Sequence, residues 1–135
     1  MDVGTGSGIL AMAAIKLGAA SALGIDNDPV AVECAREYAH VNGFGAELEL
    51  RVGSFDDCAD EEFDIIVANI DGKTLPLLCP RLARLLKPGD SGEGRICLSG
   101  LQEHDLEEIA AALNRAGFAV KMKTSREEWL ALECG

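Results

Sequence analysis

Short β-branched runs alternate with helix-favouring stretches along most of this chain. The predicted strands cover residues 22–25, 48–52, 63–68 and 95–99, and the predicted helices cover 9–17, 28–42, 75–86 and 102–116. Such alternation specifies a parallel sheet with helices on both faces. The last two runs, 118–124 and 128–134, have no helix between them and predict an antiparallel hairpin. We therefore expect an α/β fold with a mostly parallel sheet and a C-terminal antiparallel hairpin.

Composition narrows the class of protein. The chain has 135 residues, 48% of them hydrophobic, which is enough for one domain with its own core over residues 1–135. No stretch approaches the length of a membrane span, and the N-terminus has no basic start typical of a signal peptide. The net charge is −11, without a basic stripe. We therefore expect no direct contact with nucleic acid or membrane, and a basic protein or a cationic small molecule as partner. The alternative is that the acidity only supports solubility. We also expect a monomer.

Five scattered cysteines (Cys34, Cys58, Cys79, Cys97 and Cys134) form no Cys-x-x-Cys pair and no cluster with histidine. This spacing indicates neither a disulfide framework nor a zinc site, so no metal is expected. Free cysteines of this kind are typical of a reducing compartment, and we expect a cytoplasmic protein.

A glycine-rich turn, Gly4-Thr5-Gly6-Ser7-Gly8, precedes the first predicted helix. Glycines allow positive φ and close approach of the backbone to a ligand. The third glycine of the dinucleotide fingerprint would fall at position 9, which is Ile9, so nicotinamide binding is disfavoured. Only Met1–Val3 precede the turn, whereas strands average about 5–6 residues. We expect the first strand to be truncated and a longer protein to exist.

Polar side chains end two other predicted strands. Asp26 follows the strand 22–25, where a carboxylate can accept hydrogen bonds from both ribose hydroxyls of an adenosine group. Asn69 follows the apolar run 63–68, which we expect to be covered on both faces. In a doubly wound sheet such strand ends meet in one crevice. Each residue also has an ordinary alternative, a solvated turn aspartate and a turn asparagine.

Taken together, these elements resemble the Rossmann-like, seven-stranded methyltransferases that use S-adenosylmethionine, and within them the ribosomal protein L-eleven lysine methyltransferase family (PrmA). The resemblance covers essentially the whole chain and keeps its order. It is carried by six segments: Gly4–Ala14, Gly24–Pro29, Val67–Ile70, Leu85–Gly89, Leu98–Gly100 and Arg126–Trp129. The segments Val67–Ile70 and Arg126–Trp129 are the more discriminating.

The resemblance implies S-adenosylmethionine as cofactor, bound by Asp2, Gly4, Gly6, Asp26, Ser54 and Asn69. Gly4 and Gly6 would lie at its methionine side and Asp26 at its ribose. Asp2 would orient the glycine turn or meet the cofactor's amino group, and Ser54, with Phe55, would line the adenine. Asn69 is the implied catalytic residue, positioned beside the methyl group and the incoming amine.

The implied reaction is methyl transfer to lysine side chains of a ribosomal protein. Two departures bear on it: Asp71 replaces a usually apolar residue, and the family's upstream substrate-recruiting domain and threonine-rich loop are absent. One alternative is therefore an inactive, partial cofactor-binding fragment. Another is N-methylation of a different protein, a small molecule or a nucleic-acid base. The base reading is disfavoured because Ile70-Asp71-Gly72 follows Asn69 in place of a Pro-Pro-aromatic sequence.

Overall fold

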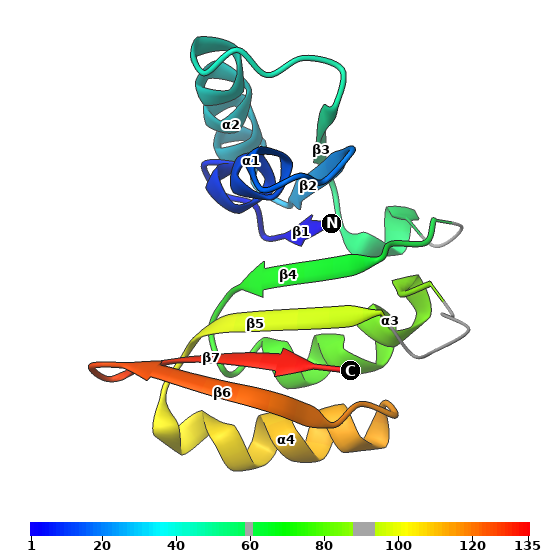
Figure 1. The fold of residues 1–135 in the computed structure, drawn as a ribbon, viewed down its shortest axis with the longest axis vertical. Coiled ribbons are helices and arrows are strands. Elements are labelled where there is room, and N and C mark those ends of the chain that lie inside the picture. The colour runs from blue at the N-terminus through cyan, green and yellow to red at the C-terminus, as the bar shows by residue number, and fades with distance from the viewer. Residues whose placement is uncertain (59–60, 88–93) are drawn as a thin grey trace. The chain divides into compact units, whose positions relative to one another are not determined.

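The computed structural model describes residues 1–58, 61–87 and 94–135, and the chain divides into two compact units, 1–58 and 59–135 (Figure 1). The segment Leu85–Gly89, which carries part of the resemblance, lies outside the described residues beyond Lys87.

The first unit contains a three-stranded parallel sheet in the order β3-β2-β1. Its elements are β1 (Asp2–Val3), α1 (Ile9–Lys16), β2 (Ala22–Asp26), α2 (Pro29–Val41), β3 (Leu48–Val52) and a short 3₁₀ helix, η1 (Phe55–Cys58). β1 has only two residues, as the position of the glycine turn predicts. The bounds of β2, α2 and β3 agree with the predicted ones within one or two residues.

Helix α2 begins where its sequence requires. The Asp28 side chain accepts a hydrogen bond from the backbone N–H of Val30 at 2.8 Å, and Pro29 occupies the first helical position. The apolar face of the helix is buried at Val32, Ala35 and Ala39. α2 and α1 pack on strands β2 and β3, so this unit has its own small core.

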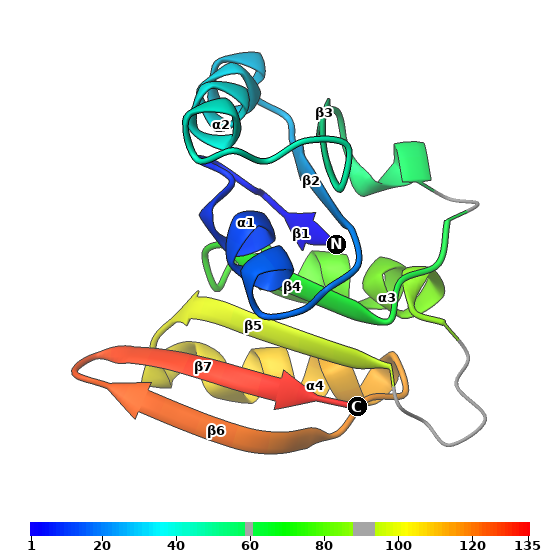
Figure 2. The same ribbon diagram turned by 45° about the horizontal axis from the view of Figure 1, so that its top comes forward.

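The second unit contains a four-stranded sheet in the order β4-β5-β7-β6 (Figures 1 and 2). Its elements are β4 (Ile65–Asn69), α3 (Leu75–Leu85), β5 (Arg95–Leu101), a 3₁₀ turn η2 (Glu103–Asp105), α4 (Leu106–Arg115), β6 (Val120–Arg126) and β7 (Trp129–Cys134). β4 and β5 are parallel, whereas β7 is antiparallel to both β5 and β6. The predicted C-terminal antiparallel hairpin is therefore confirmed.

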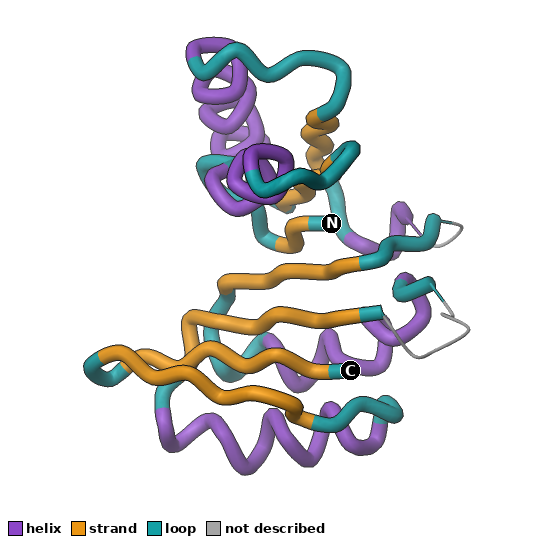
Figure 3. The backbone as a smooth tube through the Cα atoms, in the orientation of Figure 1, coloured by secondary structure: helices purple, strands orange, loops and turns teal. Residues whose placement is uncertain are grey.

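Helices α3 and α4 pack against each other along this sheet (Figure 3). Alternate strand residues are buried in the core of the unit: Ile66, Ala68, Ile96, Leu98, Leu130, Leu132 and Cys134. The run 63–68 was expected to be covered on both faces, and this is wrong at Ile65, which is 51% exposed. The neighbouring residue Ile66 points to the opposite face of the pleated strand and is fully buried.

Among the described residues, no helix is both long and apolar enough to cross a membrane.

The cysteines are free thiols: Cys58, Cys79 and Cys134 are buried, whereas Cys34 and Cys97 are partly exposed. Burial raises the pKa of the Cys134 thiol to about 12, so this side chain is a neutral core residue at physiological pH.

Candidate functional site

Asp26 holds the glycine turn in place. Its Oδ2 atom accepts a hydrogen bond from the backbone N–H of Gly6 at 2.9 Å, and its Oδ1 atom accepts one from the N–H of Asp28 at 3.0 Å. The carboxylate is partly exposed, and each oxygen can still accept a further hydrogen bond. Asp26 is therefore more than a solvated turn residue, since it links the end of β2 to the turn that follows β1.

The glycine turn leaves space for a ligand at Gly6. Gly4, Gly6 and Gly8 all have positive φ, between 53° and 79°. A Cβ atom built on Gly6 would meet no heavy atom within 4 Å, so the side on which a side chain would project is open. Backbone conformation and open space together fit the predicted role of Gly6 in binding a ligand.

Asp2 is buried directly beneath this turn. Its side chain is 1% exposed, and its Oδ2 atom accepts hydrogen bonds from the Thr5 hydroxyl at 2.7 Å and from the N–H of Ala11 at 3.1 Å. Its Oδ1 atom is buried and has no hydrogen-bond partner among the described residues. Burial raises the pKa of this carboxyl, while the Thr5 hydrogen bond partly opposes the shift. These contacts favour the turn-orienting role for Asp2.

The raised pKa predicts how Asp2 affects stability. Because the folded pKa exceeds the unfolded one, Asp2 is most favourable to folding below the unfolded pKa, near pH 4. This contribution is lost as the pH rises through the folded pKa. We expect the free energy of unfolding of the wild type, relative to Asp2→Asn, to increase on acidification, by about 1.4 kcal/mol for each unit of pKa shift. Urea unfolding of both proteins from pH 4 to 8 measures this, and a difference independent of pH would contradict it.

Ser54 lies in the short connection between β3 and the 3₁₀ helix η1. Its hydroxyl oxygen accepts a hydrogen bond from the N–H of Asp56 at 3.2 Å, and its own N–H donates to Oδ2 of Asp57 at 2.8 Å. These contacts give Ser54 a local structural role. Its place at the adenine stays a prediction, and the side chain of Phe55 is outside the described part of the chain.

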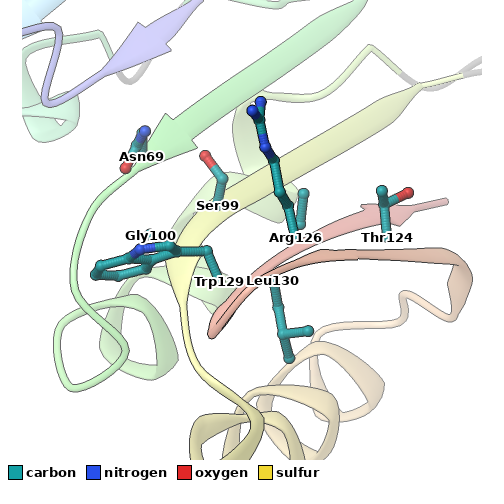
Figure 4. A pocket seen from close by; sticks show the side chains of 8 residues that line it. Asn69, Ser99, Gly100, Thr124, Arg126, Trp129 and Leu130 are labelled. Atoms are coloured by element: carbon teal, nitrogen blue, oxygen red, sulfur yellow. The ribbon is translucent and has the colours of Figure 1, made fainter.

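In the second unit, Asn69 lies at the edge of a pocket of about 410 Å³ (Figure 4). The pocket is lined by Asn69, Ser99, Gly100, Thr124, Arg126, Trp129, Leu130 and Ala131. Asn69 ends β4, Ser99 and Gly100 lie near the end of β5, and the others belong to β6 and β7. The segments Leu98–Gly100 and Arg126–Trp129, which carry part of the family resemblance, thus meet Asn69 at one place.

Gly100 permits the close approach of Asn69. Gly100 has φ +79°, and a Cβ atom there would lie 2.7 Å from Oδ1 of Asn69 and 2.9 Å from the carbonyl oxygen of Ile70. The pairing of β5 with β7 shifts register between Leu98 and Leu101, around this glycine. An irregular strand end of this kind can redirect side chains toward a site.

The hairpin turn beside the pocket has one unfavourable backbone conformation. Glu127 has φ +56°, and it is the one non-glycine residue with positive φ among those the structure describes. A left-handed conformation costs an L-residue roughly 1–2 kcal/mol, part of which glycine recovers. We expect Glu127→Gly to be neutral or to raise the free energy of unfolding by up to about 1 kcal/mol.

Glu128→Gly is the matched control for this change, since Glu128 lacks the positive φ. It should lower the free energy of unfolding, because the unfolded chain gains freedom without relief of strain. Chemical denaturation compares the two variants, and an equal loss of stability in both would argue against strain at Glu127.

The loop after Asn69 is organised by Asp71. Its Oδ1 atom accepts hydrogen bonds from the N–H groups of Lys73 and Thr74, both at 3.0 Å, and its Oδ2 atom accepts one from the Thr74 hydroxyl at 2.7 Å. The hydrogen bond from Thr74 contributes most to a lowered pKa of Asp71. The polar residue at this position thus shapes the turn that leads into α3.

The structure groups the predicted residues by unit. Asp2, Gly4, Gly6 and Asp26 come together around the glycine turn in the first unit, and Asn69 lies in the pocket of the second. Sequence reasoning missed the pocket residues Ser99, Thr124, Arg126 and Trp129 as candidate site residues. The available signal was their occurrence in or beside segments that resemble the family. No group of three or more His, Cys, Asp or Glu side chains in the described ranges could hold a metal ion.

Comparison with known proteins identifies the family. Residues 1–134 match the family model described as "Ribosomal protein L11 methyltransferase (PrmA)". Two curated relatives, both named ribosomal protein L11 methyltransferase, come from Heliobacterium modesticaldum and Symbiobacterium thermophilum and are 39% and 42% identical over 132 residues. The match covers 98% of this chain and 40% and 41% of those proteins. The chain therefore spans about two fifths of the length of these relatives.

Solved structures agree in fold. The ribosomal protein L11 methylase from Lactobacillus delbrueckii subsp. bulgaricus is 37% identical, with a TM-score of 0.91 over 99% of this chain and 67% of that one. The magnesium protoporphyrin IX methyltransferase of Synechocystis, solved with bound S-adenosylmethionine, is 19% identical, with a TM-score of 0.78 over 98% of this chain and 67% of that one. The second likeness concerns the fold alone. These matches confirm the Rossmann-like methyltransferase fold, and the family match over nearly every residue shows that the chain belongs to the ribosomal protein L11 methyltransferase family (PrmA).

Proposed function

We propose that residues 1–135 act as one S-adenosylmethionine-dependent methyltransferase domain that transfers methyl groups to lysine side chains of ribosomal protein L11. The observation that carries the proposal is the position of Asn69. It stands at the end of β4 and lines an accessible pocket together with two other segments that resemble the family. Family membership supplies the substrate class.

The residues of the first unit fit the cofactor. Gly6 leaves open space at the turn, and the partly exposed Asp26 carboxylate keeps acceptor capacity for ribose hydroxyls. In the proposal, Gly4 and Gly6 hold the methionine part, Asp26 holds the ribose, Ser54 lies at the adenine, and Asp2 supports the turn from below. When bound, S-adenosylmethionine supplies an electrophilic methyl group on a positively charged sulfur.

The reacting lysine must be a neutral amine, because an ammonium nitrogen has no lone pair. The unperturbed pKa of lysine is about 10.4, so the amine has to lose a proton to water before it reacts. The carbonyl oxygen of Asn69 is suited to accept a hydrogen bond from the amine and so to orient its lone pair. Asn69 neither gives nor takes a proton, and its proposed contribution is positioning.

Charge is consistent with this substrate. A chain with a net charge of −11 attracts basic proteins and disfavours polyanions. We accordingly propose a basic ribosomal protein as partner and the cytoplasm, where ribosomes assemble, as location.

The proposal is tested in two steps. Isothermal titration with S-adenosylmethionine should show saturable binding to this chain. Purified ribosomal protein L11 should then acquire labelled methyl groups from the labelled cofactor, at lysine residues identified by mass spectrometry. Absence of cofactor binding would overturn the cofactor assignment, and label on residues other than lysine would overturn the substrate assignment.

A second candidate is a cofactor-binding fragment that does not transfer methyl groups. Saturable binding of S-adenosylmethionine without labelling of L11 would support this reading over the first.

A further inference from the structure

Arg126 is the one charged residue, among those that the structure describes, that lines the pocket next to Asn69. The other lining residues are neutral: Asn69, Ser99, Gly100, Thr124, Trp129, Leu130 and Ala131. A guanidinium group presents five N–H donors and no acceptor, so its hydrogen-bond partners are acceptor atoms of other residues, of water or of a ligand. Arg126 is exposed at the end of β6, and Figure 4 shows its side chain extending over β5 on the side where Asn69 and Ser99 lie.

The Arg126 side chain has no acceptor of its own within the part of the chain that the structure describes. Two other cations of β5 and β6 are paired, Arg95 with Glu133 at 2.5 Å and Lys123 with Glu103 at 2.9 Å. No such contact joins Arg126 to a described carboxylate, although Glu127 and Glu128 follow it directly and the chain has 23 acidic residues. An arginine left unpaired in so acidic a chain, at the rim of a pocket, is available to a ligand.

We propose that Arg126 forms an anion subsite of this pocket and selects protein substrates in which a carboxylate lies next to the target lysine. The inference rests on the proposed function and deepens it, since Asn69 would orient the amine while Arg126 binds the neighbouring acidic group. Arginine and carboxylate can form two parallel hydrogen bonds, which adds orientation to affinity.

A single carboxylate suits the Arg126 subsite better than a ligand with many phosphates does. One guanidinium group suits one carboxylate, whereas nucleic acids require several phosphates to be neutralised by clustered cations. The strongly negative net charge opposes such a polyanion. In a peptide that carries lysine beside an acidic residue, the two opposite charges cancel. The negative net charge of the chain therefore does not repel such a peptide.

The pocket contains its own optical probe, because Trp129 is the only tryptophan in the chain and lines the same cavity. Its fluorescence can be followed while two peptides of equal size are added, acetyl-Ala-Lys-Asp-Ala-amide and acetyl-Ala-Lys-Asn-Ala-amide. The aspartate peptide should bind about tenfold more tightly, which corresponds to about 1.4 kcal/mol. A third peptide, acetyl-Ala-Lys with a free C-terminus, compared with its amide, distinguishes a terminal carboxylate from a side-chain one.

Substitutions of Arg126 test whether this residue causes the preference for the aspartate peptide. Arg126→Gln should reduce the affinity for the aspartate peptide to that for the asparagine peptide, and Arg126→Lys should retain part of the difference. Lys123→Gln is the matched control, a change of a neighbouring β6 cation outside the pocket lining, and should leave the preference intact. Circular dichroism verifies that each variant is folded, and added salt should weaken only the carboxylate-dependent part.

Equal affinities for the two peptides in the wild type, no fluorescence response to either, or a preference that survives Arg126→Gln would each overturn the inference. So would tighter binding of a short oligonucleotide than of the aspartate peptide. Failure of the proposed function gives a different pattern, in which S-adenosylmethionine does not bind although the aspartate peptide is still preferred. Methylation of both peptides at equal rates would instead leave the enzyme assignment intact and remove the anion subsite.

Discussion

Replacing Asn69 by alanine is expected to lower the rate of methyl transfer about 100-fold while changing the affinity for S-adenosylmethionine by less than tenfold. The physical reason is positional. Gly100 allows the Asn69 side chain to lie against the end of β5, where its carbonyl oxygen borders the pocket. Without that acceptor, the amine loses the contact that directs its lone pair, and a misplacement of about 1 Å can cost two orders of magnitude in rate.

Single-turnover transfer of labelled methyl groups to ribosomal protein L11, together with calorimetric titration of the cofactor, measures both quantities. Asn42→Ala is a suitable control, since Asn42 is another exposed asparagine whose Nδ2 atom donates to the carbonyl oxygen of Tyr38 at the end of α2. It should leave the rate unchanged. If Asn69→Ala transfers methyl groups as fast as the wild type, Asn69 is not the positioning residue.

Replacing Asp26 by alanine is expected to weaken S-adenosylmethionine binding by at least tenfold. The carboxylate has two tasks in this proposal: it accepts the N–H of Gly6 and keeps the glycine turn in place, and it accepts hydrogen bonds from the ribose. Loss of both raises the dissociation constant. Loss of the two backbone hydrogen bonds should also lower the free energy of unfolding by about 1–3 kcal/mol.

Asp28→Ala separates these effects. Asp28 is two residues away and exposed, and its side chain caps helix α2 through the N–H of Val30. Removing that cap should cost about 1 kcal/mol of stability but leave cofactor affinity unchanged. Calorimetric titration and urea unfolding of both variants provide the comparison. Unchanged cofactor affinity in Asp26→Ala would show that the ribose assignment is wrong.

Local signals in the sequence predicted most elements well. The Asp28–Pro29 pair predicts the start of α2, because a side-chain acceptor followed by proline satisfies and preorganises the first helical turn. Alternating residues 48–52 predict β3 with the observed bounds. Prediction was poorer where burial depends on distant residues, as at Ile65, whose exposure cannot be inferred from a continuous apolar run.

In the candidate site, too, local features were predicted from the sequence and long-range contacts were not. Glycine spacing and strand-end polar residues are local features, so Gly4, Gly6, Asp26 and Asn69 could be selected from the sequence. The hydrogen bond from Gly6 to Asp26 joins residues 20 positions apart, and the burial of Asp2 depends on contacts with Thr5 and Ala11. These contacts explain why Asp2 supports the turn, a role that the residue type alone left open.

By itself, the sequence determined the strand and helix order, the glycine turn and the family, because these follow from short-range patterns of residue type. Only the tertiary structure decided that Asn69, Gly100, Arg126 and Trp129 line one pocket. Their meeting requires β7 to pair with both β5 and β6, together with a register shift at the end of β5. Strand order and register are set by packing of the whole sheet, and no local pattern encodes which distant strand ends become neighbours.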